Sequence, residues 1–215
     1  MWLTPLWLTL AAAAAWAAPV PEPVILVYGD SLSAGYGIAV AQGWVRLLSD
    51  RVHSKGYGFQ VINASVSGET TTGGVARLPR ALAAHHPQIV IIELGGNDGL
   101  RGLPLATTRA NLDAIITLAA GGQHLSAAPR KVLVLGMRMP PNYGERYTSG
   151  FAAAYGELAR RHHAALVPFL LAGIASQPAL MQADGLHPNE RGQPLLLDNV
   201  WPVLEPLLRH VSTVK

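Results

Sequence analysis

The sequence predicts a single three-layer α/β/α domain built around a five-stranded parallel β-sheet. Five short apolar runs of the kind found in buried strands recur along the chain, and segments with helical periodicity separate them. Regular alternation of strand and helix favours a parallel sheet with helices on both faces. The chain has 215 residues, half of them hydrophobic and 13% charged, so it can bury one full core and is not disordered.

The predicted strands are rich in aliphatic and β-branched residues, and the predicted helices carry apolar residues three or four positions apart. The strands are expected at 24–28, 60–64, 89–94, 131–135 and 165–167. The helices are expected at 43–55, from about 75 to before Pro87, through Leu112 to Ala119, and through Phe151 to His162, with loops at 33–37 and 65–74. In the last apolar segment, Pro202 and Pro206 are expected to kink or divide a helix.

The first residues differ in composition from the rest of the chain. No charged side chain precedes Glu22, and Ala15-Trp16-Ala17 has the small-x-small form that signal peptidase cleaves. We therefore expect a signal peptide at residues 1–17, a linker at 18–23 and the domain at 24–215. This organisation predicts a periplasmic or secreted protein with no stable membrane anchor after cleavage. The alternative is an uncleaved anchor, which is less favoured because the segment barely reaches spanning length.

The composition also excludes several functional classes. The formal net charge is +3 and the arginines are scattered, which argues against a nucleic-acid-binding surface. The chain has no cysteine, so it has no thiol nucleophile, no disulfide and no thiolate metal site. No set of histidines has zinc-site spacing. We expect no metal and no cofactor.

Polar residues follow the carboxyl ends of the predicted strands, where open parallel sheets bind ligands. A serine hydroxyl needs a base to become a nucleophile, and a carboxylate orients an imidazole base. Ser31, His187 and Asp184 supply these three groups. The backbone N–H groups of Ser31 and Gly68 and the side-chain amide of Asn97 are candidate donors to an oxyanion. The alternative for Ser31 is that it and its neighbour Asp30 only cap the next element.

Four blocks carry these residues: GDSLSAGYG at 29–37, NASVSGET at 63–70, GGNDGLRG at 95–102 and DGLHP at 184–188. In order and spacing they resemble the four sequence blocks of the GDSL, or SGNH, hydrolases. The likeness is to the periplasmic branch of multifunctional acyl-CoA thioesterases, proteases, lysophospholipases and arylesterases. The resemblance implies a flavodoxin-like SGNH hydrolase fold. It also implies a Ser31–His187–Asp184 triad and an oxyanion hole at Ser31, Gly68 and Asn97.

Two apolar loops are candidates for an acyl pocket, because both leave the sheet at the expected catalytic edge. The alternative is that they only pack on each other. The candidate substrate-binding residues are Leu100, Leu103 and Pro104 after the third strand, and Met139, Pro141 and Tyr143 after the fourth.

Three further acids lie close to the four blocks. Asp30 and Asp98 are expected to hold turns by accepting backbone N–H groups. Glu93 lies in an apolar strand, and if it is buried it needs a partner that the sequence does not identify.

The predicted function is hydrolysis of acyl esters, thioesters and lysophospholipids through an acyl-enzyme on Ser31, in a monomer acting on small-molecule substrates. One alternative keeps the same triad but removes O-acetyl groups from carbohydrates. Another is a flavodoxin-like module that binds a phosphate ligand with the loops after the first two strands. That alternative leaves the Asp184–His187 turn without a role.

Overall fold

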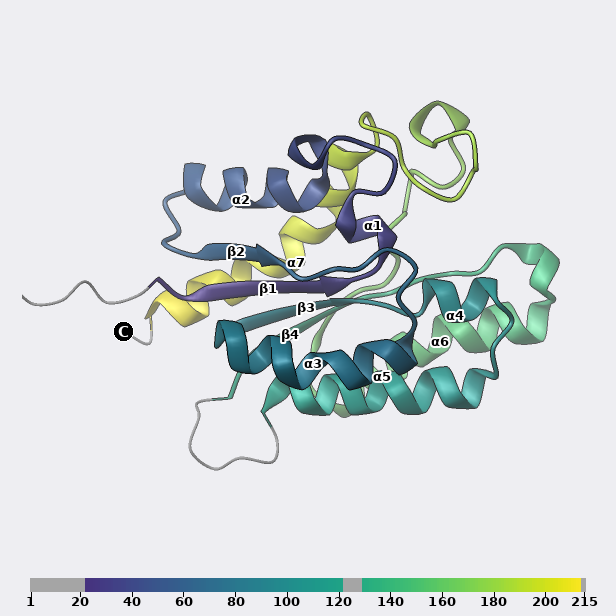
Figure 1. The fold of residues 1–215 in the computed structure, drawn as a ribbon, viewed down its shortest axis with the longest axis horizontal. Helices are drawn as coiled ribbons and strands as arrows, with labels where there is room; N and C mark the ends of the chain where they lie inside the picture. The colour runs from purple at the N-terminus through teal and green to yellow at the C-terminus, as the bar shows by residue number, and fades with distance from the viewer. Residues whose placement is uncertain (1–21, 122–128, 214–215) are drawn as a thin grey trace, which may run out of the picture.

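The computed structural model describes residues 22–121 and 129–213, so the predicted signal peptide and most of the linker lie outside the described residues. Its centre is a parallel sheet in the order β2-β1-β3-β4-β5 (Figure 1). This is the flavodoxin-like order, with the switch point between β1 and β3. The strands are β1 (Val24–Gly29), β2 (Gln60–Asn63), β3 (Ile89–Glu93), β4 (Lys131–Leu135) and β5 (Ala165–Val167). The predicted five-stranded parallel sheet is confirmed.

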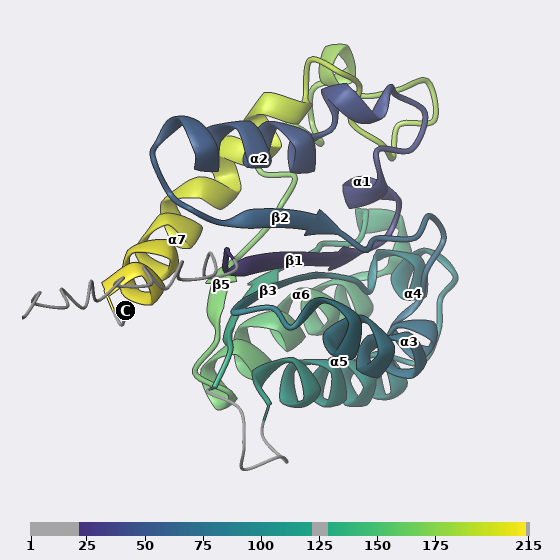
Figure 2. The same cartoon turned by 60° about the vertical axis from the view of Figure 1, so that its left-hand side comes forward.

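Helices cover both faces of this sheet (Figures 1 and 2). On one face α2 (Trp44–Ser54) packs beside α7 (Gln193–Thr213). The other face carries α3 (Thr71–His85), α5 (Leu105–Ala120) and α6 (Glu145–Arg161). Every residue of β1 and β3 is buried, as expected for strands covered on both faces. The three-layer arrangement is therefore confirmed.

Two predicted loops are partly helical. The chain forms a short helix, α1 (Ser31–Ala34), directly after β1 and ends it at Gly35 in the left-handed conformation (φ 77°). The helix α3 begins at Thr71, earlier than predicted, because the Thr70 side chain caps it by accepting the N–H of Gly73. Its Gly74 packs so tightly that a Cβ there would lie 2.7 Å from the Leu94 side chain. The glycines that suggested a loop instead allow close helix packing.

The prolines do not divide the last helix. It runs from Gln193 to Thr213 through Pro202 and Pro206, each of which removes one backbone hydrogen bond. The buried side chains of Leu196, Val200, Leu204 and Leu208 hold this helix against the sheet. No helix between residues 22 and 121, or between 129 and 213, has the length and hydropathy of a membrane span.

Short elements shape the edge of the sheet where the strands end. They are the helix α4 (Gly96–Leu100) and the 3₁₀ turns η1 (Val40–Gln42), η2 (Pro141–Tyr143) and η3 (Pro178–Leu180). An antiparallel bridge between Met181 and Pro188 closes the loop that follows η3. These elements surround the site described next.

Candidate active site

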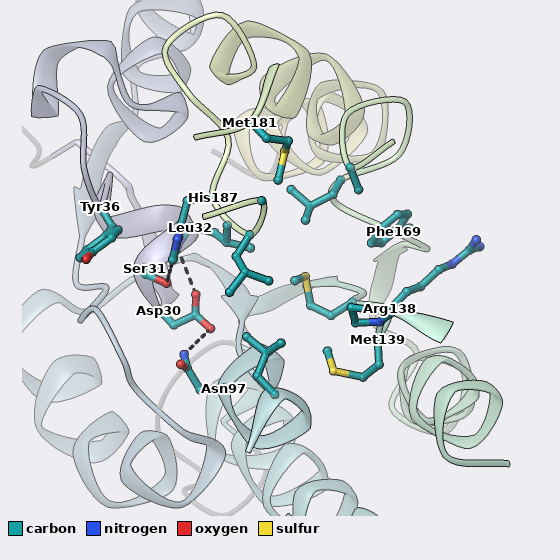
Figure 3. A pocket seen from close by; sticks show the side chains of 18 of the residues that line it. Asp30, Ser31, Leu32, Tyr36, Asn97, Arg138, Met139, Phe169, Met181 and His187 are labelled. Atoms are coloured by element: carbon teal, nitrogen blue, oxygen red, sulfur yellow. Dashed lines mark hydrogen bonds between the residues drawn. The ribbon is translucent and has the colours of Figure 1, made fainter. Parts of the chain in front are cut away.

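The three residues of the predicted triad meet at the carboxyl edge of the sheet (Figure 3). Ser31 is the first residue of α1, and His187 and Asp184 come from the loop between η3 and α7. The Nε2 atom of His187 lies 2.8 Å from the Ser31 Oγ, and its Nδ1 atom lies 2.6 Å from the Asp184 Oδ2. Residues 156 positions apart are thus joined in one hydrogen-bonded chain.

The Asp184 turn is built to keep its carboxylate ionised. The Oδ1 atom accepts the backbone N–H groups of Leu186 at 2.9 Å and His187 at 3.0 Å, while Gly185 takes a positive φ of 66° between them. Partial burial alone would raise the pKa of Asp184, but the hydrogen bonds from the His187 side chain and from these two backbone groups lower it to about 2. A negative charge therefore stands behind the imidazole near neutral pH.

The backbone N–H groups of Ser31 and Gly68 have no acceptor among the described residues. Both residues line the same cavity. Gly68 has a φ of 79°, a conformation that favours glycine. The Arg101 guanidinium fixes this loop by donating to the Gly68 carbonyl at 3.1 Å. Free N–H groups that face a cavity are suited to an anionic oxygen.

The Asn97 side chain lines the same cavity, but its amide N–H groups already have acceptors. Its Nδ2 group donates to the Asp30 Oδ2 and to the Glu69 carbonyl, each at 3.0 Å. These contacts fix its orientation, and Figure 3 shows it next to Asp30 and close to Ser31.

The two turn-forming acids behave as predicted. Asp30 accepts the N–H of Leu32 at 3.1 Å and so caps α1, which means that the capping interpretation of this turn is correct alongside its place in the site. Asp98 accepts the N–H of Thr71 at 2.8 Å and the Thr71 hydroxyl, and is buried. Asp98 therefore fixes the start of α3 and does not reach the triad.

Glu93 has partners that the sequence did not identify. It is fully buried, and its Oε2 accepts the Ser33 hydroxyl at 2.8 Å and the Asp30 N–H at 3.2 Å. Burial first, and then the Asp30 carboxylate, raise the pKa of Glu93 well above its usual value. Burial also raises the pKa of Asp30 to about 6, although hydrogen bonds from Leu32, Glu93 and Asn97 oppose it. The only signal in the sequence was an acid within an apolar strand.

A cavity of about 840 Å³ opens beside Ser31 and His187. Three of the predicted substrate-binding residues line it: Leu100, Met139 and Pro141. Figure 3 shows Ser31, His187 and Asn97 at one side of it and Phe169 and Arg138 at the other. Its lining also includes Met137, from the second apolar loop, and four residues that the sequence did not single out for the pocket, namely Phe169, Leu171, Met181 and Leu186. These four lie after β5, in a segment that leaves the sheet at the same edge.

The other three predicted substrate-binding residues do not line this cavity: Leu103, Pro104 and Tyr143. The Tyr143 hydroxyl donates to the Leu100 carbonyl and the Tyr147 hydroxyl donates to the Leu103 carbonyl, both at 2.9 Å. These tyrosines join the two apolar loops to each other. For this half of the set, the alternative of loop packing is correct.

Tyr36 is a further residue that the sequence did not single out. Its ring lies 4.7 Å from the His187 ring, measured between centroids, and it is 53% exposed at the mouth of the cavity. Gln182 donates to the Tyr36 carbonyl at 2.8 Å and so ties this loop to the His187 loop. Within the described residues, no group of three His, Asp or Glu side chains could hold a metal ion.

Comparison with known proteins places this chain in a family. The model of the GDSL-like lipase/acylhydrolase family matches residues 27–195. Esterase TesA of Pseudomonas aeruginosa is 50% identical over 184 residues, which cover 86% of this chain and 89% of the relative. Thioesterase 1/protease 1/lysophospholipase L1 of Escherichia coli is 42% identical over 188 residues, covering 87% and 86% respectively.

A solved structure agrees with these relatives. The psychrotrophic esterase EstA from a Pseudoalteromonas species, inhibited by monoethylphosphonate, superposes with a TM-score of 0.80 at 37% identity, covering 87% of this chain and all of the other. The fold and the sequence thus lead to the same assignment. The chain belongs to the GDSL-like lipase/acylhydrolase family and is an ester hydrolase.

Proposed function

We propose that the protein cleaves acyl esters and acyl thioesters of small molecules, lysophospholipids included, through an acyl-enzyme on Ser31. The observation that carries the proposal is the hydrogen-bonded chain from Ser31 through His187 to Asp184, beside the free N–H groups of Ser31 and Gly68. Two relatives, named esterase TesA and thioesterase 1/protease 1/lysophospholipase L1, support the same substrate classes.

In the first half-reaction the Ser31 oxygen attacks the acyl carbon and His187 takes the serine proton at Nε2. The imidazolium that forms is stabilised by the Asp184 carboxylate on Nδ1. The negative charge on the carbonyl oxygen is stabilised by the N–H groups of Ser31 and Gly68 and by the Asn97 amide. Because both N–H groups of that amide have acceptors, it reaches the oxyanion by sharing one hydrogen in a three-centre bond.

The tetrahedral intermediate then collapses and releases an alcohol or a thiol, which takes the proton from His187. In the second half-reaction His187 deprotonates a water molecule, which attacks the acyl carbon. The same donors hold the second oxyanion, and its collapse releases the carboxylic acid and returns the proton to Ser31.

The cavity favours acyl groups longer than acetyl. Its volume of about 840 Å³ far exceeds that of a two-carbon acyl group, and much of its lining is apolar, including Leu100, Met139, Phe169 and Leu171. An acetyl group would leave most of this surface uncovered and gain little from burial. This favours an esterase of longer acyl chains over the carbohydrate O-acetyl esterase.

The organisation of the chain outside the site is part of the same proposal. A signal peptide at residues 1–17 would direct the domain at 24–215 to the periplasm or to the outside of the cell, as a monomer. N-terminal sequencing of the protein purified from a secreting host tests the cleavage, and light scattering tests the oligomeric state. An N-terminus at Met1 in the exported protein would contradict the first point.

The decisive experiment compares wild type with Ser31→Ala on p-nitrophenyl esters of increasing acyl length and on an acetylated sugar. We expect hydrolysis that rises beyond acetate, weak activity on the sugar, and a loss of about 10³-fold or more in Ser31→Ala. An organophosphonate should modify Ser31 in wild type only, and circular dichroism should show that the variant is folded. Unchanged hydrolysis by Ser31→Ala would refute the proposal, and a preference for the acetylated sugar would favour the alternative.

A further inference from the structure

Two buried carboxyl groups adjoin the Ser31 turn and take no part in the proton transfers proposed above. Glu93, at the end of β3, is fully buried and Asp30 is 2% exposed. Throughout residues 22–121 and 129–213, no ion pair with a basic side chain involves either acid. This hydrolase therefore has two adjacent buried acids beside Ser31, and neither has a direct counter-ion among the described residues.

Glu93 contacts the chain on both sides of Ser31. Its Oε2 atom accepts the N–H of Asp30, just before the serine, and the hydroxyl of Ser33, just after it. The approach is close enough that a Cβ on Gly29 would lie 2.6 Å from this oxygen. Because Gly29 has no side chain, the Glu93 carboxyl group can approach it closely, and from the end of β3 Glu93 fixes the start of α1.

The Asp30 side chain links this turn to Asn97, one of the proposed oxyanion donors. One of its oxygens accepts the Leu32 N–H and the other accepts the Asn97 amide. His187, in the loop before α7, acts on Asp30 through its positive charge when protonated. On the α6 side, the buried Tyr155 hydroxyl donates to the Leu94 carbonyl, and burial first, then the carboxyl groups of Glu93, Asp30 and Asp98, raise the pKa of Tyr155 well above its usual value.

The donors around the two acids decide which of them carries charge. Two adjacent carboxyl groups in a buried site do not both ionise, because each charge lacks water and repels the other. Asp30 has hydrogen-bond donors on both oxygens, whereas the Glu93 Oε1 has no partner among the described residues. The single negative charge is therefore better placed on Asp30, and the proton on Glu93.

We propose that Glu93 is a positioning residue that acts as an uncharged carboxylic acid. It holds the backbone before Ser31 and the hydroxyl after it, and it leaves the one negative charge of the pair on Asp30, which orients the Asn97 amide. The kinetic consequences rest on the ester hydrolysis proposed for Ser31. The raised pKa of Glu93 and the smaller rise of the Asp30 pKa agree with this division.

The kinetic test compares Glu93→Gln with Glu93→Leu. Glutamine is neutral and its oxygen can accept from Asp30 and Ser33, so we expect kcat to fall by no more than about threefold with an unchanged pH profile. Leucine leaves both donors without an acceptor, and we expect kcat to fall at least about tenfold with little change in KM. Ser33→Ala removes one of the two contacts, so its kcat should lie between those of Glu93→Gln and Glu93→Leu.

Two kinetic outcomes would overturn the proposal. A kcat of wild-type size in folded Glu93→Leu would show that the contacts do not position Ser31. A loss in Glu93→Gln as large as that in Glu93→Leu would show that an ionised Glu93 is needed. If Glu93→Leu does not fold, Ser33→Ala tests the positioning contact, and a wild-type kcat in that variant would overturn the proposal.

An infrared difference spectrum between wild type and Glu93→Gln near neutral pH shows, without any substrate, whether the Glu93 carboxyl group is protonated. The carbonyl stretch of a protonated carboxylic acid should be present in wild type and absent from the variant. Its absence from wild type would overturn the proposal. If wild type neither hydrolyses esters nor reacts with a phosphonate, the function proposed for Ser31 fails, while this spectrum still decides the state of Glu93.

Discussion

Two aspartates adjoin the Ser31–His187 pair, and the fold gives them opposite electrostatic surroundings. Asp184 lies on an exposed turn where donors surround its carboxylate, and its pKa is lowered to about 2. Asp30 is buried beside a second acid, and its pKa is raised to about 6. Asp184 thus provides a negative charge next to His187 near neutral pH, whereas the buried Asp30 holds Leu32 and Asn97 by hydrogen bonds. Hydrogen-bond donors and burial, rather than residue type, therefore set the protonation state of a carboxyl group.

The largest expected effect comes from the exposed member of this comparison. Asp184→Asn removes the anion that orients the His187 ring and stabilises its protonated form, so kcat should fall by about 10³–10⁴-fold. Stopped-flow or steady-state hydrolysis of a p-nitrophenyl ester measures it, with Asp50→Asn on the exposed face of α2 as the control. A fall of less than tenfold would mean that Asp184 is not the partner of His187.

Substitution of the buried aspartate, Asp30, should have a smaller effect on catalysis. Asp30→Asn keeps one acceptor and loses the other, so either the Leu32 N–H or the Asn97 amide is left without its partner. Because a misplaced oxyanion donor costs about 10²-fold, we expect a loss in kcat of up to that size with little change in KM. A pure rise in KM would contradict the role of Asp30 in orienting Asn97.

The two aspartates should also differ in how they link stability to pH. The folded pKa of Asp30, about 6, lies above its usual value of 3.8, so the folded state holds the proton longer than the unfolded state. Asp30 therefore makes the free energy of unfolding fall as pH rises from 3.8 to about 6. Asp184 has the opposite sign: its stabilisation is complete above pH 3.8 and is lost as pH falls through about 2.

Urea unfolding of wild type, Asp30→Asn and Asp184→Asn across this pH range measures the difference. We expect the free energy of unfolding of wild type, relative to Asp30→Asn, to decrease between pH 3.8 and about 6. Relative to Asp184→Asn, it should not decrease over that interval. Parallel curves for all three proteins would show that burial does not raise the pKa of Asp30.

A third aspartate, Asp98, is also buried, but its hydrogen bonds go to Thr71 and not to Ser31, His187 or Asp184. Asp98 accepts both the N–H and the hydroxyl of Thr71. Asp98→Asn loses one of these acceptors, which should lower the free energy of unfolding by about 1–3 kcal/mol. Its kcat should stay within a few-fold of wild type. A large loss of kcat in a folded Asp98→Asn protein would show that burial alone, without contact, is enough to affect catalysis.

We expect the smallest effect on the rate from Tyr36, whose ring contacts the His187 ring. Tyr36→Ala removes the aromatic contact with His187, and such pairs are worth about 0.5–1.5 kcal/mol, or about two- to tenfold in rate. Tyr36→Phe keeps the ring and is the matched control. Equal rates in the two variants would show that the ring does not help to hold His187.

Much of the fold could be predicted from the sequence because it depends on local patterns. The runs at 89–94 and 131–135 are apolar enough to be read as buried strands, and their alternation with helical segments dictates a parallel sheet. The start of α3 could not be placed, because Gly73 and Gly74 are used there for packing against Leu94, a contact between distant segments.

The order of the strands along the chain is enough to predict that Ser31, Gly68, Asn97, Asp184 and His187 gather at one edge of the sheet, because residues that follow parallel strands share that edge. The packing of the folded chain determines which apolar residues line the cavity: Leu100 and Met139 do, whereas Leu103 and Tyr143 do not. It also decided that Glu93 meets Ser33 and Asp30. The physical reason is that burial and charge state depend on distances between segments far apart in the chain, and local pattern does not encode those distances.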